Sequence, residues 1–119
     1  MELGACLDRV RERRPLIHCI TNYVTANDVA NLLLACGASP IMAQAPQEMD
    51  DIAALASAVV LNTGPPDDAK FTAARLAGAA ANRRGIPVIL DPVGVGASPW
   101  RLENIRRLLQ EVHLTILRA

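Results

Sequence analysis

The strongest constraint on the fold is that short apolar segments alternate with helix-like stretches along the whole chain. Strands are predicted at residues 16–20, 39–43, 58–62 and 87–91, and a fifth begins at Leu114. Each segment is too short for a typical helix and is bounded by polar, Gly or Pro residues. Short apolar strands between helices are typical of a mostly parallel sheet with helices on both faces. The sequence therefore predicts a three-layer α/β fold.

Two of the predicted helices have clear start and stop signals. Asp67 is placed to cap a long Ala-rich helix over residues 68–84. Gly85 follows at the position where helices commonly end with a glycine in the left-handed conformation. Ser98 and Pro99 resemble the N-cap and the first residue of the last helix. The periodicity of that last helix predicts four inward residues, namely Leu102, Ile105, Leu109 and Val112.

Composition excludes several classes of function. The 12 Lys and Arg balance 12 Asp and Glu, whereas binding to nucleic acid or to an anionic membrane needs clustered positive charge. The three cysteines form no C-x-x-C pair, which argues against a zinc site or a disulfide framework. No apolar run approaches the length of a membrane span, and the N-terminus lacks a signal-peptide pattern. We therefore expect no nucleic acid or membrane partner and a cytoplasmic location.

Polar residues follow the predicted strands, and parallel strands bring their carboxyl ends to one edge of the sheet, where α/β proteins bind ligands. Asp91 ends an otherwise apolar strand, so its carboxylate must find cations or hydrogen-bond donors. It suits a Mg²⁺ ligand, a group that transfers a proton, or a cap of the following loop. Arg118 follows the last strand and suits either phosphate binding or plain solvation. His18, within an apolar strand, is expected to be a core histidine with a hydrogen-bond partner.

Three segments carry a resemblance to a known family. They are residues 15–31 (PLIHCITNYVTANDVAN), 37–42 (GASPIM) and 90–97 (LDPVGVGA). In order and spacing they resemble the signature segments of hydroxyethylthiazole kinase, a member of the ribokinase-like superfamily. The resemblance covers nearly the whole chain. It implies that residues 1–119 are the N-terminal part of a single ribokinase-like kinase domain.

The resemblance also implies an activity and a set of site residues. The family uses ATP and Mg²⁺ to phosphorylate the hydroxyl of 4-methyl-5-(2-hydroxyethyl)thiazole in thiamine biosynthesis and salvage. Met42, Asn22 and Val24 match residues that line the thiazole pocket. Asp91 matches a carboxylate near Mg²⁺ and the phosphates, and Arg118 matches an arginine that contacts ATP. A thioether suits a thiazole ring, a carboxylate suits Mg²⁺ and a guanidinium suits phosphate. Because the family forms trimers with sites between subunits, a homo-oligomer is expected.

The chain departs from the family pattern in two places. Gly64-Pro65-Pro66 stands where the family usually has Gly-Thr-Leu, and the prolines remove two N–H donors and stiffen the loop. The family's chain also continues past residue 119 into a glycine-rich segment that stabilises the transferring phosphoryl group and activates the hydroxyl. No residue of this chain is therefore assigned to catalysis.

Two alternatives to an active kinase follow from the sequence. One is an inactive truncated remnant that binds thiazole or a partner subunit. The other is a receiver-like signalling module, since five strands and five helices in about 120 residues also describe that class. A receiver needs an acidic pair after its first strand and a lysine after its last. These positions hold Thr21, Asn22 and Arg118.

Overall fold

The computed structural model describes residues 2–119, which form one five-stranded sheet with helices around it. The helices are α1 (Leu3–Arg13), α2 (Ala26–Cys36), α3 (Met49–Leu55), α4 (Asp68–Arg84) and α5 (Pro99–Glu111). The strands are β1 (Leu16–Ile20), β2 (Ser39–Met42), β3 (Ala58–Asn62), β4 (Val88–Asp91) and β5 (Ile116–Leu117). Short 3₁₀ turns, η1 (Pro46–Glu48) and η2 (Val95–Ala97), precede α3 and α5. The predicted bounds of β1 and β3 are confirmed, and those of β2, β4 and β5 differ by one or two residues at one end.

The sheet is parallel throughout, as predicted, with the strand order β2-β1-β3-β4-β5. The chain passes from β1 outward to β2 and then returns to the other side of β1 to form β3. The strand order therefore reverses between β1 and β3. All carboxyl ends lie at one edge of the sheet, and the crevice at such a reversal is where α/β proteins bind ligands.

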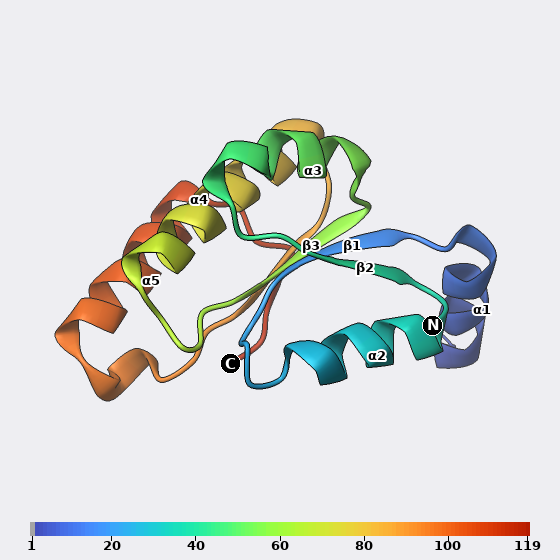
Figure 1. The fold of residues 1–119 in the computed structure, drawn as a ribbon, viewed down its shortest axis with the longest axis horizontal. Coiled ribbons are helices and arrows are strands. Elements are labelled where there is room, and N and C mark those ends of the chain that lie inside the picture. The colour runs from blue at the N-terminus through green and yellow to red at the C-terminus, as the bar shows by residue number, and fades with distance from the viewer. Residues whose placement is uncertain (1) are drawn as a thin grey trace.

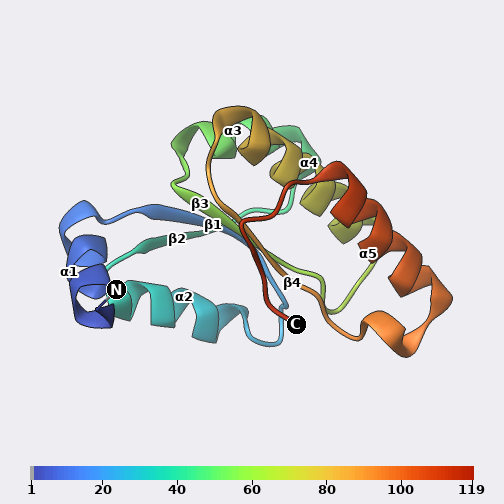
Figure 2. The same cartoon turned by 180° about the vertical axis from the view of Figure 1, so that it is seen from behind.

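Helices cover both faces of the sheet, which confirms the predicted three-layer arrangement. Figure 1 shows α3, α4 and α5 on one face and α2 on the other, and Figure 2 shows the same layers from behind. Alternate strand residues face the α4 side and are fully buried in the core, namely Val59, Leu61, Val88 and Leu90. Val60 and Ile89 point to the other face and are half-buried. The main core therefore lies between the sheet and α3, α4 and α5.

Helix α4 packs closely because the side chains it buries are mostly small. Asp67 Oδ1 accepts a hydrogen bond from the Lys70 N–H over 2.6 Å, and Gly85 ends the helix at φ +68°, both as predicted. Gly78 lies against Val112, where an added Cβ would come within 2.6 Å of a methyl carbon, so the two segments approach through a glycine. The buried alanines of the helix are Ala73, Ala74, Ala77, Ala80 and Ala81.

The inner face of α5 differs from the predicted one by a small rotation. Ile105 and Val112 are buried as predicted, but Leu102 is 42% and Leu109 is 45% exposed. Leu108 is fully buried instead. Both 108 and 109 border an apolar stripe of 3.6-residue period, and packing against α4 selects residue 108.

The three cysteines are free thiols. Cys19 is buried in β1, and burial raises the pKa of its thiol to about 11. It is therefore protonated at neutral pH and has the packing role that the sequence predicts. Within residues 2–119, no helix combines the length and apolar character needed to cross a membrane.

Candidate ligand site at the carboxyl edge of the sheet

Asp91, at the end of β4, accepts hydrogen bonds from both neighbouring strand ends. Asn62 is its register partner in β3 and donates from Nδ2 to Asp91 Oδ2 over 2.9 Å. Arg118, just after β5, donates from Nη1 to Asp91 Oδ1 over 3.0 Å in an ion pair. The prediction that this carboxylate finds a cation or donors is confirmed. The Arg118 side chain is 77% exposed and that of Asp91 only 23%, so the arginine is the movable partner.

The loops after β1, β3 and β4 meet at Gly64. Its N–H donates to Asn62 Oδ1 over 2.9 Å, while Thr63 Oγ1 accepts from the Val93 N–H over 2.9 Å. A Cβ on residue 64 would lie only 3.0 Å from both Asn22 Nδ2 and Val93 Cγ1. The close approach of the three loops therefore depends on a residue without a side chain at position 64.

Lys70, in the first turn of α4, is a residue of the candidate site that the sequence analysis did not predict. Its Nζ donates to the carbonyls of Thr21 over 3.0 Å and Gly64 over 2.7 Å, and the residue is only 4% exposed. Burial lowers the pKa of Lys70, and the nearby Asp67 charge partly opposes this. A cation in the first turn also opposes the helix dipole. The unusual position of the chain's single lysine was the only signal that could have found it.

These contacts join into one series of hydrogen bonds along the carboxyl edge. The series runs from Thr21, after β1, through Lys70 to the loop after β3. It continues through Asn62 to Asp91 at the end of β4 and to Arg118 after β5. It links four strand ends in their spatial order, so side chains fix their relative positions in addition to the backbone pairing.

The remaining predicted site residues lie at the same edge. Asn22 Oδ1 accepts from the Val24 N–H over 2.9 Å, which shapes the turn before α2 and leaves Val24 75% exposed. Met42 ends β2, pairs in register with Cys19 of β1 and is 39% exposed. Met42 makes no hydrogen bond to the series, because it lies on the outer strand. With about 4.8 Å between strands, the ends of β2 and β4 are roughly 14 Å apart.

His18 anchors the chain beside Met42. It is 1% exposed, and its Nε2 lies 2.8 Å from the carbonyl oxygen of Ala43, to which a neutral Nε2–H donates. Burial lowers the pKa of His18, against the effects of the Ala43 bond and the Glu48 charge. This is the satisfied core histidine that the sequence predicts. Its bond holds the end of β2 against β1.

Asp91 is the single carboxylate in this series of contacts. Among the described residues no group of three or more His, Cys, Asp or Glu side chains is placed to hold a metal. The edge therefore suits a cation that takes few protein ligands. Mg²⁺ is such a cation, because it commonly binds one or two carboxylates and completes its shell with phosphate oxygens and water.

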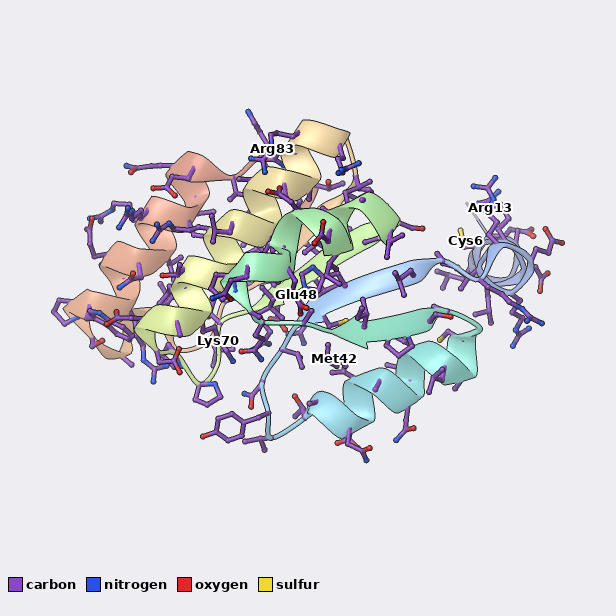
Figure 3. All side chains as sticks on the ribbon, turned by 45° about the horizontal axis from the view of Figure 1, so that its top comes forward. Cys6, Arg13, Met42, Glu48, Lys70 and Arg83 are labelled. Atoms are coloured by element: carbon purple, nitrogen blue, oxygen red, sulfur yellow. The ribbon has the colours of Figure 1, made fainter. Side chains whose placement is uncertain are left out.

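A hollow of about 320 Å³ lies at the opposite, amino edge of the sheet. Figure 3 shows two of its lining residues, Cys6 and Arg13, on α1 and well away from Met42 and Lys70. It shares no residue with the series of contacts and belongs to another part of the surface. Its lining residues are Cys6, Arg9, Val10, Arg13, Pro15 and Ser57.

The fold and the polar edge together define a parallel α/β protein with a candidate ligand site at the reversal of strand order. The model of the hydroxyethylthiazole kinase family matches residues 7–119, and the chain belongs to this family. The hydroxyethylthiazole kinase of Alkaliphilus oremlandii (strain OhILAs) is 50% identical over 118 residues, which cover 99% of this chain and 44% of that protein. The hydroxyethylthiazole kinase of Glaesserella parasuis serovar 5 (strain SH0165) is 54% identical over 113 residues, which cover 95% of this chain and 42% of that protein.

Solved structures agree on the fold. The hydroxyethylthiazole kinase protein from Pyrococcus horikoshii OT3 superimposes with a TM-score of 0.90 at 45% identity, covering 95% of this chain and 44% of that chain. This chain thus spans less than half the length of these relatives. The receiver domain of a sensor histidine kinase from Pseudomonas aeruginosa PAO1 has a TM-score of 0.60 at 16% identity over 88% of this chain, a likeness of fold alone.

Proposed function

We propose that residues 1–119 are the N-terminal part of a single ribokinase-like hydroxyethylthiazole kinase domain. Its reaction is transfer of the γ-phosphate of ATP to the hydroxyl of 4-methyl-5-(2-hydroxyethyl)thiazole, in thiamine biosynthesis or salvage. The family match supports the class of reaction. The observation that carries the proposal is that all the residues expected from the family resemblance lie at or just after strand ends at one edge of the sheet. They are Asn22, Val24, Met42, Asp91 and Arg118.

The thiazole side of the proposed site lies at the ends of β1 and β2. Met42 and Val24 are exposed enough to contact a ligand, and a thioether packs favourably against an aromatic ring. Asn22 supplies a polar amide next to these apolar groups. This mixture suits a small heteroaromatic alcohol, which presents a ring face together with polar atoms.

The phosphate side lies at the ends of β4 and β5. The Arg118 guanidinium is able to bind two phosphate oxygens of ATP, and its exposure lets it turn from Asp91 without uncovering a buried group. Asp91 would hold Mg²⁺, which supplies positive charge against the developing charge of the transferring phosphoryl group. Asn62 orients the Asp91 carboxylate through its 2.9 Å hydrogen bond.

A second candidate function is binding of thiazole or of a partner subunit without turnover. The relatives are more than twice as long as the matched segment. In the kinase proposal, the groups that activate the hydroxyl and stabilise the phosphoryl group lie outside these 119 residues. Where the second candidate binds thiazole, it shares the thiazole side of the site with the kinase and differs from it only in turnover.

A homo-oligomer, a trimer by family resemblance, is part of the proposal. Helix α2 has no buried residue, and Leu32 and Leu34 are 65% and 57% exposed. Tyr23, just before the helix, is 76% exposed. A helix that buries none of its apolar side chains within the described chain favours contact with another subunit. Sedimentation velocity of the chain tests the proposed oligomer, and a monomer at all concentrations would contradict it.

A cytoplasmic location is also part of the proposal. The free thiols of the three cysteines support it.

Calorimetry and an ADP-release assay together test the function. We expect the chain to bind hydroxyethylthiazole, and to release ADP only when the C-terminal part of a family member is supplied in trans. Asp91→Ala should abolish that complemented turnover, while Asp51→Ala, an exposed carboxylate on α3, should not. A chain that binds but stays inactive after complementation fits the binding-only candidate. A chain that binds no hydroxyethylthiazole contradicts the kinase proposal and leaves the second candidate only its partner-binding form.

A further inference from the structure

We propose that Lys70 is a positioning residue that holds the thiazole-side loop after β1 in place relative to the loop after β3. The inference rests on the proposed function for its ligand. Lys70 Nζ donates to the carbonyls of Thr21 and Gly64, over 3.0 and 2.7 Å, and so joins the loops on the two sides of the reversal in strand order. This is the point where α/β proteins bind ligands.

An ammonium group is well suited to join two carbonyls. It has three N–H donors, no acceptor and a compact charge on a flexible stem. At 4% exposure the Lys70 contacts lie out of bulk water, and hydrogen bonds from a charged donor are the strong ones. The ion pairs among the described residues do not include Lys70, so its charge is directed at the two carbonyl oxygens.

The loop after β3 needs such a contact because of its two prolines. Pro65 and Pro66 have no N–H donors, so the loop has few hydrogen bonds of its own. Gly64 is held through its N–H by Asn62 and through its carbonyl by Lys70. The Gly-Pro-Pro departure from the family pattern and the buried lysine are therefore parts of one local arrangement.

The two sides of the site depend unequally on Lys70. On the thiazole side, Thr21 precedes Asn22, whose side chain shapes the turn that presents Val24. On the phosphate side, Asp91 is held directly by Asn62 and Arg118. Loss of the Lys70 contacts should therefore displace the thiazole side and leave the phosphate side nearly unchanged.

The test compares two variants. Lys70→Met keeps a side chain of similar length and removes the N–H donors. Arg83→Met is the control, because Arg83 lies near the far end of α4 (Figure 3). In Lys70→Met we expect the Kd for hydroxyethylthiazole to rise about tenfold or more, with the Kd for Mg·ATP changed less than about twofold. Arg83→Met should change neither. If Lys70→Met does not fold, Lys70→Gln replaces it, because its shorter side chain cannot span both carbonyls. The same changes in the two Kd values are expected.

Amide hydrogen exchange gives a readout that needs no ligand. The Val24, Thr25 and Gly64 amides should exchange faster in the Lys70 variant, while Val93, held by Thr63 Oγ1, should not. Unchanged exchange overturns the inference, as does equal acceleration at all amides, which marks general destabilisation. If the unmodified chain binds no hydroxyethylthiazole, the proposed function fails while exchange still decides the role of Lys70.

Discussion

Asn62 and Asp91 lie opposite each other in β3 and β4, and the Asn62 side-chain amide donates to the Asp91 carboxylate over 2.9 Å. The carbonyl of the same Asn62 side chain accepts from the Gly64 N–H. One half-buried amide thus orients a carboxylate and shapes a loop. Both contacts involve neighbouring strand ends at the carboxyl edge of the sheet, so stability and the geometry of the candidate site depend on the same side chain.

Replacing Asn62 by Ala should cost about 1–3 kcal/mol of the free energy of unfolding, since it removes one of the two hydrogen bonds to the half-buried Asp91 carboxylate and leaves the Gly64 N–H without its partner. Urea unfolding of the chain measures this. Asn27→Ala is the control, because Asn27 is exposed on α2 and should change stability by less than about 0.5 kcal/mol. Equal losses in the two variants would contradict the assigned role of Asn62.

Replacing Arg118 by Lys should weaken Mg·ATP binding about tenfold, since a point-like ammonium cannot bind two phosphate oxygens as a guanidinium does. Stability should change by less than about 1 kcal/mol, because the ion pair with Asp91 involves a 77% exposed arginine. Calorimetry measures the binding. Arg107→Lys, an exposed position on α5, should leave the ATP affinity unchanged.

Replacing Met42 by Ala should lower the affinity for hydroxyethylthiazole about three- to tenfold, because the contact between the thioether and the ring is lost. Met42 is 39% exposed, so the loss of stability should be small. Leu55→Ala removes a similar apolar side chain that is 68% exposed at the end of α3. A matching drop in affinity in the Leu55 variant would show that the effect is not local to the site.

The stability of the chain should fall in mild acid because of His18, whose pKa is lowered by burial from its ordinary 6.5. Between the lowered folded value and 6.5 the unfolded chain binds more protons, so the free energy of unfolding falls as the pH falls through this window. Above it both states hold neutral imidazole and the effect vanishes. Urea unfolding measures the free energy of unfolding at about pH 7.5 and about pH 5. The difference between these two values should be smaller in His18→Gln than in the unmodified chain. A difference between the two pH values as large in His18→Gln as in the unmodified chain would contradict this role of His18.

Replacing Gly64 by Ala should destabilise the chain by about 1–3 kcal/mol, because the new Cβ forces Asn22 and Val93 to move. Hydroxyethylthiazole binding should weaken as well, since Asn22 is displaced. Gly96→Ala is the matched control, because nothing lies within 4 Å of a Cβ at that position. Thermal unfolding and calorimetry check both effects. A Gly64 variant as stable as the Gly96 variant would refute the close packing of the three loops.

Much of the fold was predictable because its signals are local. The cap of α4 depends on Asp67 and the backbone three residues further on, and Gly85 adopts its left-handed turn from its own lack of a side chain. The short apolar strands likewise follow from neighbouring residues. The buried face of α5 was less predictable, since Leu108 and Leu109 suit the stripe equally well until α4 packs against one of them.

The candidate site was predictable as a set of positions but not as a set of contacts. A parallel sheet places Asn22, Met42, Asp91 and Arg118 at one edge, so their chain positions after strands were informative. Their partners were not. Lys70 is 49 residues from Thr21, and nothing near either residue in the chain indicates the other.

The amino-acid sequence was sufficient for the order of strands and helices, their approximate ends and the polar residues that follow each strand, because interactions within a few residues set all of these. The strand order β2-β1-β3-β4-β5 and the pairing of Asn62 with Asp91 arose from packing and register between distant segments. The buried ammonium of Lys70 has the same origin, since two loops must come together before its carbonyl partners lie within reach.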